Sequence, residues 1–273
     1  MIGHGRSHGA ISVINAIPCG IGSTIGVDLT TDVTFSDDVD ATNIRIEGSP
    51  DMDDGLVRLC VRSTMERVGI DTDTPYSLAV RSMIPPSRGL KSSSSVCNAT
   101  IAAVLDAYGE SMDEMEMLRI GVDCAKEAGV TITGAFDDVC GCHFGGVVFT
   151  DNSKNELIGR NDIGRYDVVL RIPDRIIPKN RVSVDRYRER KDEFSEALRI
   201  AYERPLEALT INGRLVAEII GADTSIIDMA LENGAIAAGI SGTGPAIAAV
   251  TEHGKGKELA SILGGKTIVT VTR

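Results

Sequence analysis

The feature that most constrains the fold of this chain is a turn at residues 85–95, between a predicted strand and a predicted helix. Residues 76–84 alternate apolar and polar side chains, which predicts a strand, and residues 96–108 form a run of small residues that predicts a helix ending at Gly109. Because serine is a preferred N-cap, we expect this helix to begin inside the four serines that precede residue 96. The turn therefore delivers backbone N–H groups to a helix N-terminus.

Such a turn is suited to binding an anion. The unsatisfied N–H groups and the helix dipole favour negative charge, with phosphate as the natural guest, and Lys91 adds a positive charge. A serine hydroxyl there can face a Mg²⁺ held between phosphates. The run is neither a Walker loop nor a Rossmann fingerprint, since both glycine patterns are absent from it. On the residues alone, a serine-rich helix cap without a ligand is an equal alternative.

The length and element pattern predict two α+β domains. A chain of 273 residues suits two domains, strands and helices alternate in both halves, and the composition shifts near residues 151–155, which divides the chain into residues 1–151 and 152–273. Segment 36–54 is expected to be a solvated connection and segment 132–138 a loop or strand. Further predicted helices cover 54–69, 111–129 (with a capping box at Ser111 to Glu114), 192–202, 206–220, 225–232 and 257–263, and further strands cover 9–35, 145–150, 166–172, 235–240, 246–250 and 267–271.

Charge and composition exclude several classes of function. The net charge of −11 argues against non-specific nucleic-acid binding, which draws on clustered Lys and Arg. No apolar run suits a membrane span or a signal peptide, so we expect a soluble, cytoplasmic protein without a membrane partner. The six cysteines are expected to be reduced thiols. Cys140 and Cys142 lack a second ligand pair for zinc and are interpreted as small buried thiols on a strand or turn.

The order of residues in the turn resembles the second signature of the GHMP kinases, which wraps the phosphates of ATP. Its Lys91 and the serines that follow look like the archaeal-type shikimate kinase branch of that family. Three further segments agree with this branch, and together the four cover almost the whole chain. They are residues 15–29, residues 131–138 followed by Gly145-Gly146, and the glycine-rich motif of Ser241, Gly242, Thr243, Gly244 and Pro245.

The resemblance implies a fold and an activity. The fold would be the two-domain α+β GHMP kinase fold, with an N-terminal domain like domain 2 of ribosomal protein S5 and a ferredoxin-like C-terminal domain. The activity would be transfer of the γ-phosphoryl group of ATP, with Mg²⁺, to the 3-hydroxyl of shikimate, on the route to chorismate and the aromatic amino acids. The alternatives are a homoserine kinase of the same fold and a GHMP-like module that binds a phosphate ligand without catalysis.

The resemblance also assigns roles to residues by motif. Ser93 and Glu127 would hold the metal, and Lys91 would assist catalysis. The base would be an aspartate before the double glycine: counting back from Gly145 favours Asp138, and counting forward from Gly134 favours Asp137. The ATP-binding run would be Pro85, Pro86, Ser87, Arg88, Gly89, Leu90, Lys91, Ser92, Ser93, Ser94 and Ser95.

Elementary chemistry adds two expectations about the acids and the acceptor. Two adjacent carboxylates that point into one site would raise the pKa of one of them by mutual repulsion. Shikimate carries a carboxylate and three hydroxyl groups, so its pocket should present a cation and several hydrogen-bonding groups. The usual first signature of the family is altered at residues 6–9. The candidates for contact with the acceptor are Arg6, His8, Asn15 and Arg165.

Overall fold

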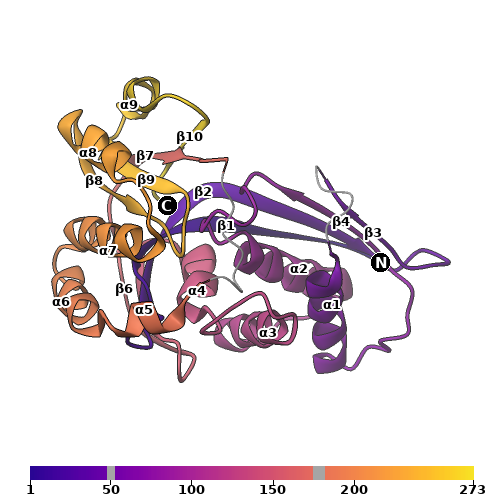
Figure 1. Ribbon diagram of the computed structural model, residues 1–273. Coiled ribbons are helices and arrows are strands. Elements are labelled where there is room, and N and C mark those ends of the chain that lie inside the picture. The colour runs from indigo at the N-terminus through magenta and orange to yellow at the C-terminus, as the bar shows by residue number, and fades with distance from the viewer. Residues whose placement is uncertain (48–52, 175–181) are drawn as a thin grey trace.

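The first half of the molecule is built on a six-stranded sheet (Figure 1). The computed structural model describes residues 1–47, 53–174 and 182–273. The long second strand pairs with the first along one edge, and with the fourth and fifth strands along the other. The strands are β1 (Ile2–Ile14), β2 (Ile21–Ser36), β3 (Asn43–Ile46), β4 (Ser77–Ser82), β5 (Val147–Asp151) and β6 (Glu156–Asn161).

Four helices cover one face of this sheet (Figure 1). The central one packs so closely on β1 that a Cβ atom on Gly3 would lie 2.2 Å from the carbonyl oxygen of Ala103, and one on Gly5 would lie 1.9 Å from that of Ala99. The many small residues of the sequence therefore let a helix backbone lie directly on a strand. The helices are α1 (Gly55–Arg67), α2 (Ser92–Tyr108), α3 (Glu114–Glu127) and α4 (Phe136–Phe144).

The second half is built on a four-stranded antiparallel sheet with the strand order β10-β7-β9-β8. Numbered along this half alone, the order is 4-1-3-2 with helices after the first and third strands, which is the ferredoxin-like arrangement that we predicted. The strands are β7 (Tyr166–Arg171), β8 (Ala235–Ile240), β9 (Ile247–Glu252) and β10 (Thr267–Val271). The helices are α5 (Val184–Arg188), α6 (Lys191–Ala201), α7 (Pro205–Ile220), α8 (Ser225–Glu232) and α9 (Gly256–Leu263).

The two halves share one hydrophobic core. Ile11 and Ile14 of β1 belong to the same buried cluster as Val168 of β7 and Leu209 of α7. The predicted division between residues 151 and 152 falls inside the first sheet, because β6 pairs with β5 beyond it. The first sheet therefore continues to Asn161, and the second begins at Tyr166. In the parts of the chain that the structure describes, no helix combines the length and the apolar character needed to cross a bilayer.

Four local expectations were wrong. Helix α4 begins at Phe136, inside the segment 132–138 that was expected to be a loop or strand, and Cys140 and Cys142, expected on a strand or turn, are buried on this helix. The cap of α3 is Asp113 rather than Ser111: the Asp113 carboxylate accepts from the backbone N–H of Glu116 at 3.1 Å. The connection 36–54 contains strand β3, and its residues 48–52 lie outside the described part of the chain. Helix α5 was not expected.

Candidate active site

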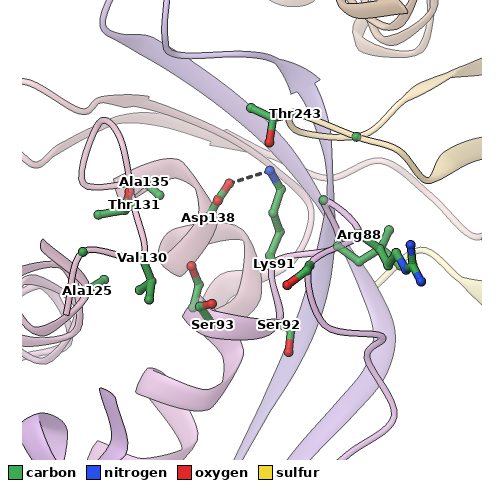
Figure 2. Close-up of a pocket in the computed structure, with 16 residues that line it drawn as sticks. Arg88, Lys91, Ser92, Ser93, Ala125, Val130, Thr131, Ala135, Asp138 and Thr243 are labelled. Carbon is green, nitrogen blue, oxygen red and sulfur yellow. Dashed lines mark ion pairs between the residues drawn. The ribbon is translucent and has the colours of Figure 1, made fainter. Parts of the chain in front are cut away.

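A cavity of about 420 Å³ lies beside the turn that precedes α2. Its walls are the turn, the end of α3, the segment leading into α4, and the glycine-rich motif between β8 and β9 (Figure 2). Of the predicted ATP-binding run, the eight residues 87–94 line it, whereas Pro85, Pro86 and Ser95 do not. Its lining residues outside the turn are Ala125, Gly129, Val130, Thr131, Ala135, Asp138, Thr243 and Gly244.

A second, smaller cavity of about 40 Å³ adjoins the first. The residues that line both cavities include Lys91, Asp138 and Thr243, so these side chains form the boundary between them. The small cavity extends towards the end of β1 and the start of α4. Its remaining lining residues are Ser12, Asn15, Ala16, Ile17, Thr131, Ile132, Thr133, Ala135, Asp137 and Gly242.

Unusual backbone conformations give the turn much of its shape. Gly89 has φ +82, and a Cβ atom there would lie 2.1 Å from the carbonyl oxygen of Ser241. Ser87 and Lys91 also adopt positive φ, which is uncommon for residues with a side chain. Helix α2 begins at Ser92, the first of the serines, and Lys91 occupies its N-cap position. This geometry leaves Ser92 and Ser93 as part of the cavity wall (Figure 2).

Lys91 is the buried cation of the site. Its Nζ lies 2.8 Å from Oδ1 of Asp138 (Figure 2). It also donates at 2.8 Å to Oγ of Ser12. Burial lowers the pKa of Lys91, but the negative charges of Asp138 and Asp137 outweigh it, so the pKa is raised. Lys91 therefore stays charged. An ammonium group carries three N–H donors, and the two bonds to Ser12 and Asp138 leave one for the cavity.

The two adjacent aspartates stand in the first turn of α4 and have different partners. Asp138 pairs with Lys91, whereas the Oδ1 atom of Asp137 accepts from Nδ2 of Asn152 at 2.7 Å. The Asn152 amide oxygen in turn accepts from the Asp137 backbone N–H at 3.1 Å and from the Thr150 hydroxyl at 2.7 Å. Burial, and then the negative charge of Asp138, raise the pKa of Asp137 to about 6, against the opposing effect of Lys91.

Hydrogen bonds join strand β1, the turn and the glycine-rich motif across the two halves. The Ser12 backbone N–H of β1 donates to Oγ of Ser241 at 3.1 Å, and that hydroxyl donates to the carbonyl of Gly89 at 2.8 Å. The Gly242 backbone N–H donates to Oγ of Ser12 at 2.9 Å, and the Ala246 N–H donates to the carbonyl of Arg88 at 3.1 Å. The glycine-rich motif thus holds β1 and the turn in fixed relation, and the site needs both halves of the chain.

The structure separates the two residues predicted to hold a metal. Ser93 lines the large cavity, but Glu127 lines neither cavity. The Glu127 carboxylate is 58% exposed and accepts from Arg62 at 3.0 Å on the surface between α1 and α3. Within the described residues, no group of three or more His, Cys, Asp or Glu side chains is arranged to hold a metal ion.

Of the four candidates for contact with the acceptor, only Asn15 lines either of the two cavities described above. Its side chain donates to the carbonyl of Gly242 at 3.2 Å. Arg6 of β1 is exposed and pairs with Asp32 of the neighbouring strand β2. His8 lies 3.7 Å from Asp28, and burial, together with the charge of Arg273, lowers its pKa. Arg165 is exposed in the connection between the sheets.

Sequence reasoning missed three polar residues of the site. Ser12 is one of many small residues in β1, and nothing in its neighbourhood marks it. Asn152 stands in a polar stretch that looked like a connection between domains. Thr133 belongs to the predicted motif of residues 131–138, and its hydroxyl accepts from the Asn152 amide at 3.3 Å. Only Thr133 could have been found, from its place in that motif.

Comparison with known proteins places the chain in a family. The model for the GHMP kinases N terminal domain matches residues 55–146, and the model for the GHMP kinases C terminal matches residues 188–267. A shikimate kinase of Methanosarcina acetivorans is 38% identical over 266 residues, which cover 95% of this chain and 88% of the relative. The chain belongs to the GHMP kinases, in the archaeal-type shikimate kinase branch. A shikimate kinase of Thermococcus kodakarensis is 36% identical over 247 residues, which cover 89% of this chain and 90% of the relative.

Solved structures confirm the GHMP kinase fold. The mevalonate kinase of Methanococcus jannaschii superposes with a TM-score of 0.80 at 17% identity, covering 100% of this chain and 98% of that one. A homoserine kinase from Cytophaga hutchinsonii superposes with a TM-score of 0.71 at 16% identity, covering 99% of this chain and 94% of that one. At these identities the likeness concerns the fold alone.

Proposed function

We propose that this protein is a shikimate kinase, which transfers the γ-phosphoryl group of ATP to the 3-hydroxyl of shikimate. The observation that carries the proposal is the Lys91–Asp138 pair at the boundary of two cavities, one of about 420 Å³ and one of about 40 Å³. The large cavity has a helix N-terminus and a serine-rich turn, and the small one has polar side chains. The relatives of 36–38% identity that are named shikimate kinase support the choice of acceptor.

The large cavity is the nucleotide site in this proposal. Backbone N–H groups at the start of α2 and the hydroxyls of Ser92 and Ser93 face the phosphates. The Lys91 ammonium, with its third N–H group, stabilises the charge that accumulates on the transferred phosphoryl group. Ala125 and Val130, on the opposite wall, offer apolar surface to the adenine ring of ATP.

The small cavity holds the acceptor in this proposal, and Asp138 is its base. Asp138 lines both cavities, so an alcohol bound in the small one meets the phosphoryl donor at this carboxylate. Lys91 holds the Oδ1 atom of Asp138 and so fixes its orientation. The other oxygen takes the proton of the hydroxyl group as the oxygen–phosphorus bond forms and ADP leaves. Of the two aspartates that the sequence offered, this geometry favours Asp138.

Mg²⁺ fits the large cavity as a partner of the nucleotide. The ion takes oxygen ligands and is held through few protein groups together with substrate phosphates and water. Ser93 presents a hydroxyl oxygen in the cavity wall and would hold it there. When bound, Mg²⁺ neutralises phosphate charge. The position of Glu127 on Arg62 leaves it outside this set.

The test is an acceptor comparison with purified protein, ATP and Mg²⁺. ADP release should depend on shikimate, and the product should carry the phosphate on the 3-hydroxyl. Homoserine, supplied alone, should give ADP release no faster than ATP and Mg²⁺ without acceptor. Absence of shikimate-dependent ADP release would overturn the proposal, and homoserine-dependent release would replace it with the alternative acceptor.

The metal assignment has its own test, a Mg²⁺ titration of two matched variants. Ser93→Ala should raise the Mg²⁺ concentration needed for half-maximal rate by roughly tenfold, because it removes a ligand. Glu127→Gln should change it less than about twofold, because an exposed ion pair contributes little. If Glu127→Gln raised the required Mg²⁺ concentration more than Ser93→Ala, the result would assign the metal to Glu127, as the family motif implies.

A further inference from the structure

The carboxylate of Asp137 has an oxygen without a hydrogen-bond partner. Asp137 is only 5% exposed and lines the small cavity. Asn152 donates to Oδ1, whereas among the described residues no donor reaches Oδ2. Carboxylate oxygens in a protein interior or cavity are normally satisfied by protein, water or a ligand. This oxygen is therefore available to a donor that enters the cavity.

The neighbouring Asp138 is arranged in the same way. Its Oδ1 atom is held by the Lys91 ammonium at 2.8 Å, and among the described residues no hydrogen-bond donor reaches Oδ2. Both aspartates line the cavity of about 40 Å³, and each has one oxygen that is held and one that no donor among the described residues reaches. Two open acceptors side by side match two O–H donors on one small molecule.

We propose that Asp137 binds a second hydroxyl group of the acceptor, on the carbon next to the one that reacts, and so selects a vicinal diol. This inference rests on the proposed function and names the acceptor feature that Asp137 recognises. In shikimate, the hydroxyl next to the reactive 3-hydroxyl is the 4-hydroxyl. The carboxylate of shikimate lies across the ring from the 4-hydroxyl, away from two carboxylates that would repel it.

Two neighbours fix the position of Asp137. Asn152 binds both its carboxylate and its backbone N–H, and Thr150 and Thr133 hold Asn152 in turn. A Cβ atom on Gly22 of β2 would lie 2.5 Å from the carboxyl carbon of Asp137. Only glycine leaves room for the carboxylate there. Asn152 is therefore a positioning residue, and Asp137 the residue that touches the acceptor.

The arrangement assigns different roles to the two acids. Asp138 faces the phosphoryl donor and carries the cation, as a base for the reacting hydroxyl requires. Asp137 lines only the small cavity, and its partner is a neutral amide. A group that binds a hydroxyl remote from the bond being made should affect acceptor choice more than the chemistry of transfer.

The test combines removal of the residue with removal of the hydroxyl. The kcat/KM of wild type and Asp137→Asn is measured with shikimate, 4-deoxyshikimate and 5-deoxyshikimate. The matched control is Asp151→Asn, which changes a half-buried aspartate of the same region that accepts from Ser153 and lines neither cavity. We expect Asp137→Asn to lower kcat/KM about 30-fold for shikimate and 5-deoxyshikimate, and less than about threefold for 4-deoxyshikimate. Asn152→Ala should repeat this pattern more weakly, which a purely structural role would not.

The possible outcomes distinguish failure of this inference from failure of the proposed function. An equal loss for shikimate and 4-deoxyshikimate would overturn the inference, since Asp137 would then act on the reacting hydroxyl or on the fold. Calorimetric binding of shikimate to Asp137→Asn provides a second readout, and unchanged affinity together with unchanged acceptor preference would also overturn it. If wild type phosphorylates homoserine and not shikimate, the proposed function itself has failed. If wild type uses shikimate but does not discriminate against 4-deoxyshikimate, only this inference fails.

Discussion

The turn before α2 and the first turn of α4 face the same cavity but are built on different principles. In the turn, positive φ angles and backbone bonds set the shape, and the serine side chains stay exposed to the cavity. In α4, the side chains of Asp137 and Asp138 are buried. Asn152 donates to the first and Lys91 pairs with the second. Binding of a polyanion needs many similar donors, whereas proton transfer needs one group in one place.

The difference teaches which changes each region should tolerate. Apart from Ser93, the proposed metal ligand, the turn should accept loss of individual hydroxyls but not of the backbone conformation at Gly89. The acid pair should accept small backbone adjustments but not loss of a carboxylate. The four predictions below test this contrast, beginning with the largest expected effect.

Replacement of the base should give the largest effect. Asp138→Asn should lower kcat by about 10³-fold, within the usual contribution of a general base, and change the Kd for ATP less than about threefold. Steady-state kinetics and nucleotide titration measure the two quantities. Retention of kcat within tenfold of wild type would mean that the carboxylate takes no proton.

Distortion of the turn should affect binding rather than chemistry. Gly89→Ala places a Cβ atom 2.1 Å from the Ser241 carbonyl oxygen and at φ +82, so the turn must shift and the Kd for ATP should rise about 100-fold. Gly69→Ala, at φ +73 with open space around it, carries the same conformational strain without the collision. Equal affinity in the two variants would show that the approach to Ser241 does not shape the nucleotide site.

Asp137, the buried aspartate that is not the proposed base, should make the stability of the protein depend on pH. The pKa of Asp137 is raised to about 6 in the folded protein, so between about pH 4 and 6 the folded state binds more protons than the unfolded state. The free energy of unfolding should therefore fall as pH rises through this window, by up to about 3 kcal/mol. Urea unfolding from pH 4 to 7 should show the decline in wild type and not in Asp137→Asn. A decline of the same size in both proteins would contradict the assignment.

A carboxylate with a structural role should behave in the opposite way. Burial opposes, but the Gly256 N–H, His253 and the Gly254 N–H together lower the pKa of Asp167. Its contribution to stability is therefore present above the pKa of the unfolded state and is lost as pH falls below it. Asp167→Asn should lower the free energy of unfolding by about 1–2 kcal/mol at pH 7, and much less at pH 3, without changing kcat. An unchanged urea midpoint at pH 7 would show that these bonds add nothing.

Much of the fold follows from local patterns in the sequence. Helix α8 and strand β8 have the predicted bounds because a clear periodicity ends at the Asn233-Gly234 turn. Helix α4 was not predicted because its residues 136–142 are all buried and no polar face marks the helical period. Strand β3 is four residues long and lies at a sheet edge, so its two alternating isoleucines, Ile44 and Ile46, are too short a run to predict a strand among acidic and turn residues.

The site could be predicted only where its residues follow one another along the chain. The turn and the acid pair are continuous motifs, and their residue types already suggest an anion and a proton acceptor. Ser12 and Asn152 act through contacts with residues 79 and 15 positions away along the chain. Such pairings depend on how β1 and β5 place the chain beside α2 and α4, which no local pattern reveals.

The hydroxyl of Ser241 has a consequence for how this enzyme can be dissected. It joins β1 to the turn but comes from the second half of the chain. A fragment ending near residue 161 would contain Asp137, Asp138, Ser12 and the serines of the turn, yet would lack the Ser241 carbonyl against which Gly89 is fitted. Cutting between the sheets would thus yield no autonomous nucleotide-binding module, and activity would return only on reassembly of both pieces.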